Sequence, residues 1–214
     1  MGHARTGMDR IDHLVYAAPD LEAGVNKIES LTGVRAAVGG SHPGMGTRNA
    51  LVSLGPDVYL EIIAPDPAQV DYRSPRLFRV DEANVPQLTT WAAKSDDVAA
   101  IASASLPDGS APGSPMAGSR ITPDGATLTW ELTDPYIEIA AGAVPFFINW
   151  GASPHPARSA PGGVTLAGFR IEHPAADFVR AALGALGLHV PVDEESQVAL
   201  IAIIDTPRGQ IELR

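Results

Sequence analysis

A histidine and a glutamate stand in two strand-like segments in which a polar side chain is expensive to bury. His13 lies in the run 11–17, and Glu61 lies between Leu60 and Ile62 in an apolar run. A buried carboxylate needs a pairing or ligating partner. A histidine on an adjacent strand supplies one, and the two together suit a divalent ion such as Zn, Fe, Mn or Ni. A structural hydrogen bond between a core histidine and a core carboxylate is the alternative.

The segment 41–49 gathers polar side chains and two glycines directly before another apolar run. Glycine allows a ligand to approach the backbone closely, and arginine offers a planar fork for a carboxylate or phosphate. A solvated hairpin tip is the alternative. The candidate ligand-binding residues of this segment are Thr47, Arg48 and Asn49, with His42 beside them.

Aromatic residues concentrate farther along the chain, where all three tryptophans lie between residues 91 and 150. Aromatic walls with one arginine and one amide suit a small organic ligand. This pattern makes Trp91, Arg120 and Asn149 candidate contacts. Core packing is the more frequent role of strand tryptophans, whereas the amide of Asn149 needs hydrogen-bond partners within an apolar run.

The elements that must position these residues follow a repeated pattern. Residues 10–65 read as a strand, a helix that begins near Asp20 and ends at Gly33, and three further strands. Residues 87–150 read as a less regular copy, with a helix over 98–105, and residues 164–214 as a third. We therefore predict an α+β protein of three βαβββ units, joined by two proline-rich segments.

Composition excludes several classes of function. The formal net charge of −10 argues against a nucleic acid or an anionic membrane as partner. The chain has no cysteine, so disulfides and thiolate metal sites are excluded. The apolar runs fall far short of the ~20 residues of a membrane span, and residues 1–8 lack the apolar segment of a secretory signal. We expect a cytoplasmic protein with a small-molecule ligand.

Several motifs make residues 11–150 similar to glyoxalase-like domain proteins of the vicinal oxygen chelate (VOC) superfamily. The resemblance implies repeated βαβββ modules that form curved mixed sheets around a cup, as in glyoxalases, bleomycin resistance proteins and related dioxygenases. The motifs that carry it are Asp12-His-Leu-Val15, Pro19-Asp-Leu21, the run 41–51, the run Tyr59–Asp66, Arg120-x-x-Pro-Asp-Gly125 and Pro145–Trp150.

In that superfamily, the first and fourth strands of paired modules hold a divalent metal. His13 and Glu61 match this pair in the first unit, and Glu212 matches the fourth-strand position of the last unit. The middle unit has Thr90 at the first-strand position and no carboxylate over 147–149. A site of His13, Glu61 and Glu212 therefore requires the first and last units to pair.

The resemblance implies a metal-dependent isomerase, lyase or dioxygenase that acts on a small, oxygen-rich organic molecule. The metal would act as a Lewis acid, and Glu61 or His42 would move a proton. The alternative is a metal-free protein that binds or sequesters a small molecule. The last strand, over 210–214, could pair with a second copy of the chain, which makes a homodimer the candidate assembly.

Overall fold

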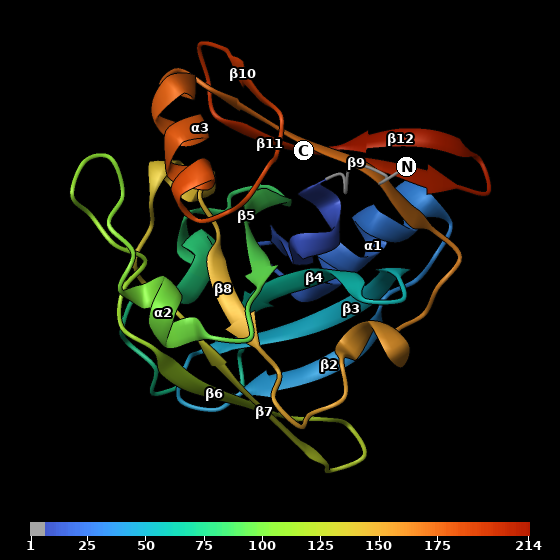
Figure 1. Cartoon of the computed structure of the whole chain (residues 1–214). Coiled ribbons are helices and arrows are strands. Elements are labelled where there is room, and N and C mark those ends of the chain that lie inside the picture. The colour runs from blue at the N-terminus through green and yellow to red at the C-terminus, as the bar shows by residue number, and fades with distance from the viewer. Residues whose placement is uncertain (1–6) are drawn as a thin grey trace.

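The computed structural model describes residues 7–214, which form two β-sheets (Figure 1). One sheet closes into a barrel of strand order β1-β4-β3-β2-β6-β7-β8-β5, and the other has the order β10-β9-β11-β12. Within the described part, no helix is long and apolar enough to cross a membrane. The prediction about a secretory signal rests largely on residues 1–6, which lie outside the described residues.

The first half of the barrel follows the predicted order of elements. Helix α1 begins where the Asp20 side chain accepts hydrogen bonds from the backbone N–H groups of Glu22 and Ala23, and it ends at Gly33, whose φ is 76°. Gly24 brings α1 close to the sheet, because an added Cβ would lie 2.6 Å from Ile62 Cγ2. The elements are β1 (Ile11–Ala17), α1 (Leu21–Thr32), β2 (Ala37–His42), β3 (Thr47–Gly55) and β4 (Val58–Pro65).

The second half repeats the pairing of the first. The parallel pair β1–β4 corresponds to the parallel pair β5–β8, and antiparallel pairing of β1 with β5 and of β2 with β6 closes the barrel. Helix α2 is shorter than predicted and ends at Ala102, where the Ser103 hydroxyl donates to the Ala99 carbonyl. The elements are β5 (Gln87–Lys94), α2 (Val98–Ala102), β6 (Met116–Ile121), β7 (Thr127–Leu132) and β8 (Phe146–Asn149).

The C-terminal segment has the predicted order of elements but a different pairing of strands. Strand β9 lies between β10 and β11, whereas β1 of the first half pairs with β4. The segment therefore forms its own sheet, and the first unit pairs with the middle one. Strand β12 is at an edge of this sheet. The elements are β9 (Thr165–His173), α3 (Ala176–Ala185), β10 (Val192–Glu194), β11 (Ala199–Thr206) and β12 (Gly209–Leu213).

A shared hydrophobic core joins the two sheets. Trp91 is fully buried in it, and its ring meets Phe169 of β9 edge-on at 5.3 Å between centroids. The Trp91 indole N–H donates to the carbonyl of Ala143 at 3.0 Å. Because alternate residues of a strand face opposite sides, Trp91 points out of the barrel while Thr90 and Ala92 point the other way. The structure therefore places Trp91 in the core, away from the barrel interior.

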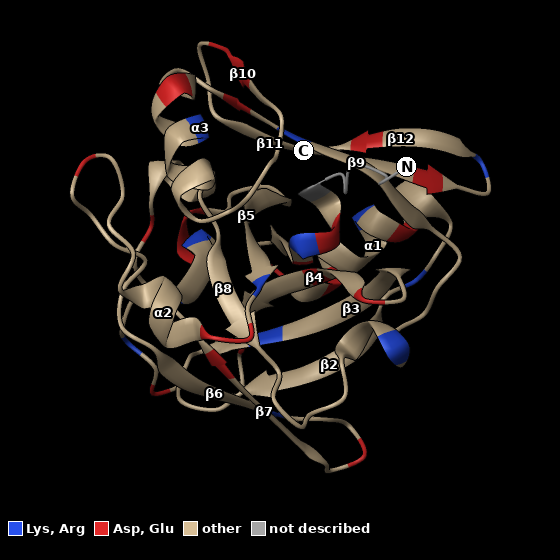
Figure 2. Cartoon of the chain, in the orientation of Figure 1, with Lys and Arg blue, Asp and Glu red and all other residues tan. Residues whose placement is uncertain are grey.

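Charged residues are distributed over loops, helices and both sheets (Figure 2). The described part of the chain nevertheless buries four side chains of the Asp, Glu, Lys and Arg types, namely Asp12, Glu61, Asp66 and Arg120. Such groups are rarely buried without partners. Three of the four, all except Asp66, lie in or beside one pocket.

Candidate active site

The barrel encloses a pocket to which both halves contribute side chains. The cavity has a volume of about 40 Å³. Its apolar wall includes Trp130 and Trp150, whose ring centroids lie 5.1 Å apart. Its polar residues are His13, His42, Asn49, Tyr59, Glu61 and Arg120.

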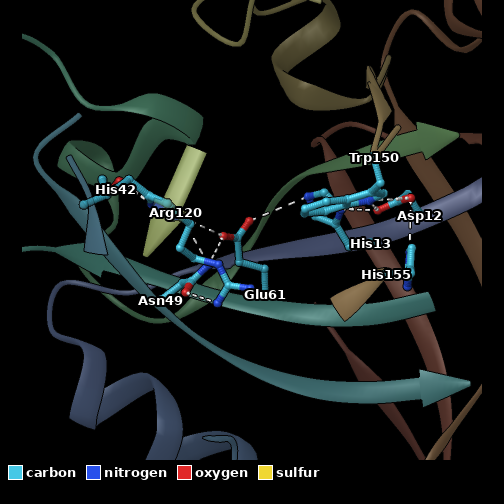
Figure 3. Close-up of polar contacts among 9 residues, drawn as sticks. Asp12, His13, His42, Asn49, Glu61, Arg120, Trp150 and His155 are labelled. Atoms are coloured by element: carbon cyan, nitrogen blue, oxygen red, sulfur yellow. Dashed lines mark hydrogen bonds and ion pairs between the residues drawn. The ribbon is translucent and has the colours of Figure 1, made fainter. Parts of the chain in front are cut away.

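Glu61 occupies the centre of the polar group (Figure 3). Its side chain is only 7% exposed, and Oε1 accepts a hydrogen bond from Asn49 Nδ2 at 2.6 Å. Oε2 lies 3.7 Å from His13 Nε2, and Oε1 lies 3.9 Å from His42 Nε2. The two imidazoles lie on opposite sides of the carboxylate in Figure 3. A buried carboxylate thus faces a possible proton partner on each side.

A β-bulge positions His13 together with the preceding carboxylate. Ile11 pairs with Ala93 and His13 with Ala92, so Asp12 is an extra residue on β1. The bulge allows Asp12 Oδ1 to lie 2.8 Å from His13 Nδ1. Because this contact engages Nδ1, His13 presents Nε2 to the pocket, where it can accept or release a proton.

Asp12 is itself held by two residues from the segment after β8. Its Oδ2 lies 3.2 Å from His155 Nε2, and the indole N–H of Trp150 donates to Oδ1 at 3.2 Å. Burial would raise the pKa of Asp12, but the hydrogen bonds with His13 and His155 outweigh it and hold that pKa well below its usual range. Asp12 is therefore an anion that orients His13.

His42 is held in its neutral form on the other side of Glu61. Burial lowers the pKa of His42, although the charge of Glu61 opposes the shift. Its Nδ1 lies 2.9 Å from Thr47 Oγ1, and its Nε2 lies 3.3 Å from Asn49 Nδ2. When His42 Nδ1 donates to Thr47 Oγ1, Nε2 can accept a hydrogen bond from Asn49 Nδ2. This hydrogen bond fixes the orientation of the Asn49 amide, which also donates to Glu61.

Arg120 brings a positive charge into this interior. It is 4% exposed, and its Nη1 lies 3.5 Å from Asn49 Oδ1. Gly39 on β2 makes room for both side chains, since an added Cβ would lie 2.2 Å from Asn49 Oδ1 and 2.3 Å from Arg120 Nη1. The guanidinium can offset the charge of Glu61 and can bind an anionic oxygen of a ligand.

Tyr59 forms the wall beside His13. The two rings are stacked, with centroids 4.6 Å apart and an interplanar angle of 19°. Burial, with a smaller effect of the Glu61 and Asp12 charges, raises the pKa of Tyr59 well above 10. The phenol therefore stays protonated and can donate a hydrogen bond, but it is not a base near neutral pH.

The structure brings five of the residues predicted from the sequence into this pocket and leaves others outside it. His13, His42, Asn49, Glu61 and Arg120 line the pocket, and Thr47 is buried behind His42.

Four predicted site residues lie outside the pocket. Trp91 is in the hydrophobic core, against Phe169, and the other three are Asn149, Arg48 and Glu212. The amide of Asn149 donates to the carbonyl of Asp96 at 3.2 Å and lies outside the pocket. Arg48 lines a separate surface groove beside Asp66. Glu212 belongs to β12 in the second sheet, where it is half exposed and pairs with Arg170 and Arg214.

Other residues at the site are absent from the sequence prediction. Asp12 has one visible signal, a carboxylate next to His13 in an apolar strand. His155 has none, because its proline-rich segment favours a solvated side chain, yet its side chain is 11% exposed and lies against Asp12. Phe78 and Leu77 come from the other proline-rich segment and line the pocket.

The metal site implied by the family resemblance does not fit the donors present. Among the described residues, no three His, Asp or Glu side chains are grouped so that one ion could bind them. His13 and His42 lie on opposite sides of Glu61, and the facing β8 supplies Phe146 and Ile148 to the pocket. A divalent ion normally has at least three protein ligands in such enzymes, so we derive no chemical step through a metal.

The chain is similar to several solved structures. The most similar structures include a hypothetical protein from Staphylococcus aureus (14% identity, 94% of this chain, 83% of that chain, TM-score 0.61). They also include methylmalonyl-CoA epimerase from Mycobacterium tuberculosis (15% identity, 69% of this chain, 90% of that chain, TM-score 0.40). A mutant of 4-hydroxymandelate synthase from Streptomyces coelicolor is a further match (13% identity, 95% of this chain, 62% of that chain, TM-score 0.41). The comparison with curated proteins found no match.

The family assignment rests on a match that spans most of the chain. A family model described as the glyoxalase-like domain matches residues 11–187, which include the whole barrel and the first strand and helix of the C-terminal segment. This range contains every polar residue of the pocket. The structure confirms the curved mixed sheets of βαβββ units that the motifs implied. The chain therefore belongs to the glyoxalase-like domain family, within the VOC superfamily.

Proposed function

We propose that the protein is an enzyme that moves a proton on a small, oxygen-bearing organic molecule held in the barrel pocket, in an isomerase or lyase reaction. One observation carries this proposal, namely the Asp12–His13 pair facing the buried Glu61 carboxylate at 3.7 Å. An imidazole oriented by a carboxylate is a common general base, and a second proton carrier beside it can complete a transfer.

Each polar residue of the pocket has a separate role in this reaction. His13 Nε2 removes a proton from carbon next to a carbonyl or carboxylate group, and Asp12 stabilises the imidazolium that forms. Arg120 and the Tyr59 hydroxyl are the donors for the negative charge that develops on the substrate oxygen. His13 Nε2 passes this proton to Glu61 Oε2, 3.7 Å away, and Glu61 delivers it to the neighbouring atom of the substrate, which returns both residues to their starting states. Ring-cleaving dioxygenase chemistry has less support, because over residues 7–214 no three metal-ligating side chains are grouped at the pocket.

Deuterium exchange with a panel of candidate substrates tests this proposal. The protein in D2O is incubated with 2-oxo acids, 2-hydroxy aldehydes and malonate monoesters, and loss of the C–H signal is followed by proton NMR. We expect exchange of at least one compound, and a fall of about 100-fold or more in Glu61→Gln and in His13→Gln. Glu212→Gln, in the other sheet, is the matched control and should exchange at the rate of the unmodified protein.

A metal-free binding or sequestering protein is the second candidate. The aromatic wall of the pocket favours it, because Trp130 and Trp150 can hold a flat or apolar ligand without chemistry. The same panel separates the two functions. A compound that quenches tryptophan fluorescence but exchanges no proton, equally in the unmodified protein and Glu61→Gln, would contradict the enzyme and support the binding protein.

Association of two chains through the edge strand β12 is a further part of this proposal. Among the described strands β12 pairs with β11 alone, and an edge strand of this kind favours pairing with a second copy. Light scattering should give a mass near twice that of the 22.3 kDa chain. A mass equal to that of one chain at all concentrations would exclude the homodimer.

A further inference from the structure

The polar and the aromatic side chains of the barrel pocket lie at different depths. The six polar residues of the pocket, from His13 to Arg120 in the sequence, are all buried. Phe78, Trp130 and Trp150 line the same pocket but are only partly buried. The charged and hydrogen-bonding groups therefore form the floor of the pocket. The three aromatic side chains lie nearer to solvent, and we name them the aromatic rim.

Aromatic rings also stand directly beside the histidines of the floor. The rings of His42 and Trp130 meet edge-on, with centroids 6.4 Å apart. Phe78 is stacked on Phe146 at 4.7 Å between centroids, and Phe146 meets the ring of His13 at 5.5 Å. Each imidazole of the floor therefore has an aromatic ring of the wall next to it.

Phe78 reaches the rim through a strained backbone. Its φ and ψ are 58° and 30°, and those of Arg79 are 59° and 27°. Both residues lie in the left-handed region, which residues with a Cβ seldom adopt. Strain of this kind is concentrated at active sites and ligand-binding segments. The backbone conformation that holds the Phe78 ring at the pocket therefore supports a role of this ring in ligand binding.

The aromatic rim is suited to the apolar part of a ligand. Exposed apolar side chains that gather at one place often mark a binding site. Pockets for organic molecules combine an apolar lining with a few polar groups that fix the orientation of the ligand. A flat ring against the rim would remove apolar surface of both partners from water. A ligand whose oxygen reaches the floor thus places its apolar part at the rim.

The charges near the floor favour an uncharged oxygen-bearing group. Glu61 and Asp12 are carboxylates, and Arg120 is the one cation among the described residues that line the pocket. With His13 neutral, as a base must be, a carboxylate ligand would bring a third negative charge towards a single guanidinium. Burial weakens the screening of such repulsion by water. A ketone or aldehyde oxygen accepts a hydrogen bond from Arg120 without this repulsion.

We propose that the ligand of the barrel pocket is an uncharged aryl ketone or aldehyde, with its carbonyl oxygen at Arg120 and its aromatic ring against the aromatic rim. The inference rests on the proposed function in treating this ligand as the substrate, whose C–H bond next to the carbonyl group faces His13. It narrows the substrate to a molecule with two parts, a neutral carbonyl head and a flat apolar tail.

Binding of three small molecules tests the two parts separately. 4-Phenyl-2-butanone has both the ring and the carbonyl group, 2-butanone lacks the ring, and 3-phenylpropanoate has a carboxylate in place of the methyl ketone. Dissociation constants are measured by isothermal titration calorimetry at about pH 8, where the carboxylate is ionised. We expect 4-phenyl-2-butanone to bind at least about 30-fold more tightly than 2-butanone. It should bind about tenfold more tightly than 3-phenylpropanoate.

Phe78→Ala and Trp130→Ala test the placement of the ring. Each should lower the preference for 4-phenyl-2-butanone over 2-butanone by about fivefold, because each removes part of the surface that the ring would cover. Tyr136→Ala is the matched control and should keep the full preference, since Tyr136 is exposed and lies outside the barrel pocket. Thermal unfolding shows which variants are folded, and one folded rim variant is enough. A preference that the folded rim variants leave unchanged would overturn this placement.

Glu61→Gln tests the uncharged head. Removal of the negative charge should tighten the binding of 3-phenylpropanoate about tenfold and change that of 4-phenyl-2-butanone less than about threefold. Glu212→Gln, in the other sheet, should change neither. If the unmodified protein bound 3-phenylpropanoate more tightly than the ketone, or if Glu61→Gln left their ratio unchanged, the inference would be wrong. Absence of measurable binding of 4-phenyl-2-butanone would also overturn it.

None of these binding measurements involves turnover, so the two proposals can fail separately. If the binding results are as expected but no compound exchanges deuterium, the ligand class stands and the proton-transfer proposal fails. If deuterium exchange depends on Glu61 and His13 but the ring gives no gain in binding, the proton-transfer proposal stands and the ligand class fails.

Discussion

Asp12 Oδ1 lies 2.8 Å from Nδ1 of His13, the next residue along β1. Neighbouring residues of a regular strand point to opposite faces, so this contact depends on the bulge that inserts Asp12 opposite β5. A single strand thereby supplies both an imidazole and the carboxylate that orients it. The bulge is thus the feature of the fold that most directly creates the candidate active site.

Asp12→Asn should change which ring nitrogen of neutral His13 carries the hydrogen. An amide cannot replace the anion that favours a proton on Nδ1, so we expect a mixture of tautomers and a fall in deuterium exchange of about 100-fold or more. Two-bond proton–nitrogen NMR of the imidazole ring measures the tautomer. Asp57→Asn, at an exposed turn, is the control. An unchanged His13 tautomer in Asp12→Asn would show that the carboxylate does not orient the ring.

Asp12 should also stabilise the fold in a pH-dependent way. Its native pKa lies below the ordinary value of about 4, so its contribution is complete above that value and is lost as the pH falls towards the native pKa. The difference in unfolding free energy between the protein and Asp12→Asn should therefore be largest near neutral pH and shrink below about pH 4. Urea unfolding at a series of pH values measures it. A difference that grows on acidification would contradict this assignment.

His42 should make the protein less stable in mild acid. Burial lowers the native pKa of His42, so below the ordinary value of about 6.5 the unfolded chain takes up a proton that the native protein excludes. Stability from this residue is complete above that pH and decreases below it. His42→Gln should reduce the slope of unfolding free energy against pH between about 5 and 6.5.

His189→Gln, at an exposed position, is the control for this slope and should leave it unchanged. Part of the slope should persist in His42→Gln, because burial also lowers the pKa of His173. An identical slope in the unmodified protein and in His42→Gln would mean that His42 is protonated in the native state as readily as in the unfolded chain.

Metal chelation should change neither the stability nor the proposed activity. The pocket places His13 and His42 on opposite sides of Glu61 and supplies no further ligand from β8, so a tightly held ion has too few donors. Elemental analysis of the purified protein, and thermal unfolding with and without EDTA, measure this. A stoichiometric metal that is lost in His13→Ala would contradict the metal-free site and restore the Lewis-acid mechanism.

The strand patterns predicted two of the polar residues that line the barrel pocket. His13 and Glu61 interrupt apolar runs and were expected on adjacent strands, and β1 and β4 are neighbours in the barrel sheet. His155 was not predictable, because its contact with Asp12 joins residues 143 positions apart and its segment has no periodicity. Phe78 was missed for the same reason, since it lies on a short 3-10 helix within the other proline-rich segment.

The order of elements predicted the C-terminal segment but not its pairing. Strand β9 pairs with β10 on one side and with β11 on the other. Burial of this sheet against the barrel, rather than the local sequence pattern, determines these partners. Glu212 consequently lies among Arg170 and Arg214 and not beside Glu61. Local sequence specifies helices and strands, whereas the partners of each strand depend on residues far away in the chain.

The direction in which the Trp91 side chain points also depends on residues far away in the chain. The sequence could not distinguish the inward face of β5 from the outward one, and the structure places Trp91 outward against Phe169, with its N–H on the carbonyl of Ala143. Trp91→Phe removes this donor and leaves a void, so the unfolding free energy should fall by about 1–3 kcal/mol.

Trp130→Phe changes a partly exposed residue of the pocket and is the matched comparison. It should cost less stability than Trp91→Phe but should alter the fluorescence response to pocket ligands, because its indole lines the cavity. Urea unfolding and ligand titration of the two variants measure both effects. If Trp91→Phe left stability unchanged and weakened ligand binding instead, the indole of Trp91 would belong to the site and the core between the two sheets would have to be held by other contacts.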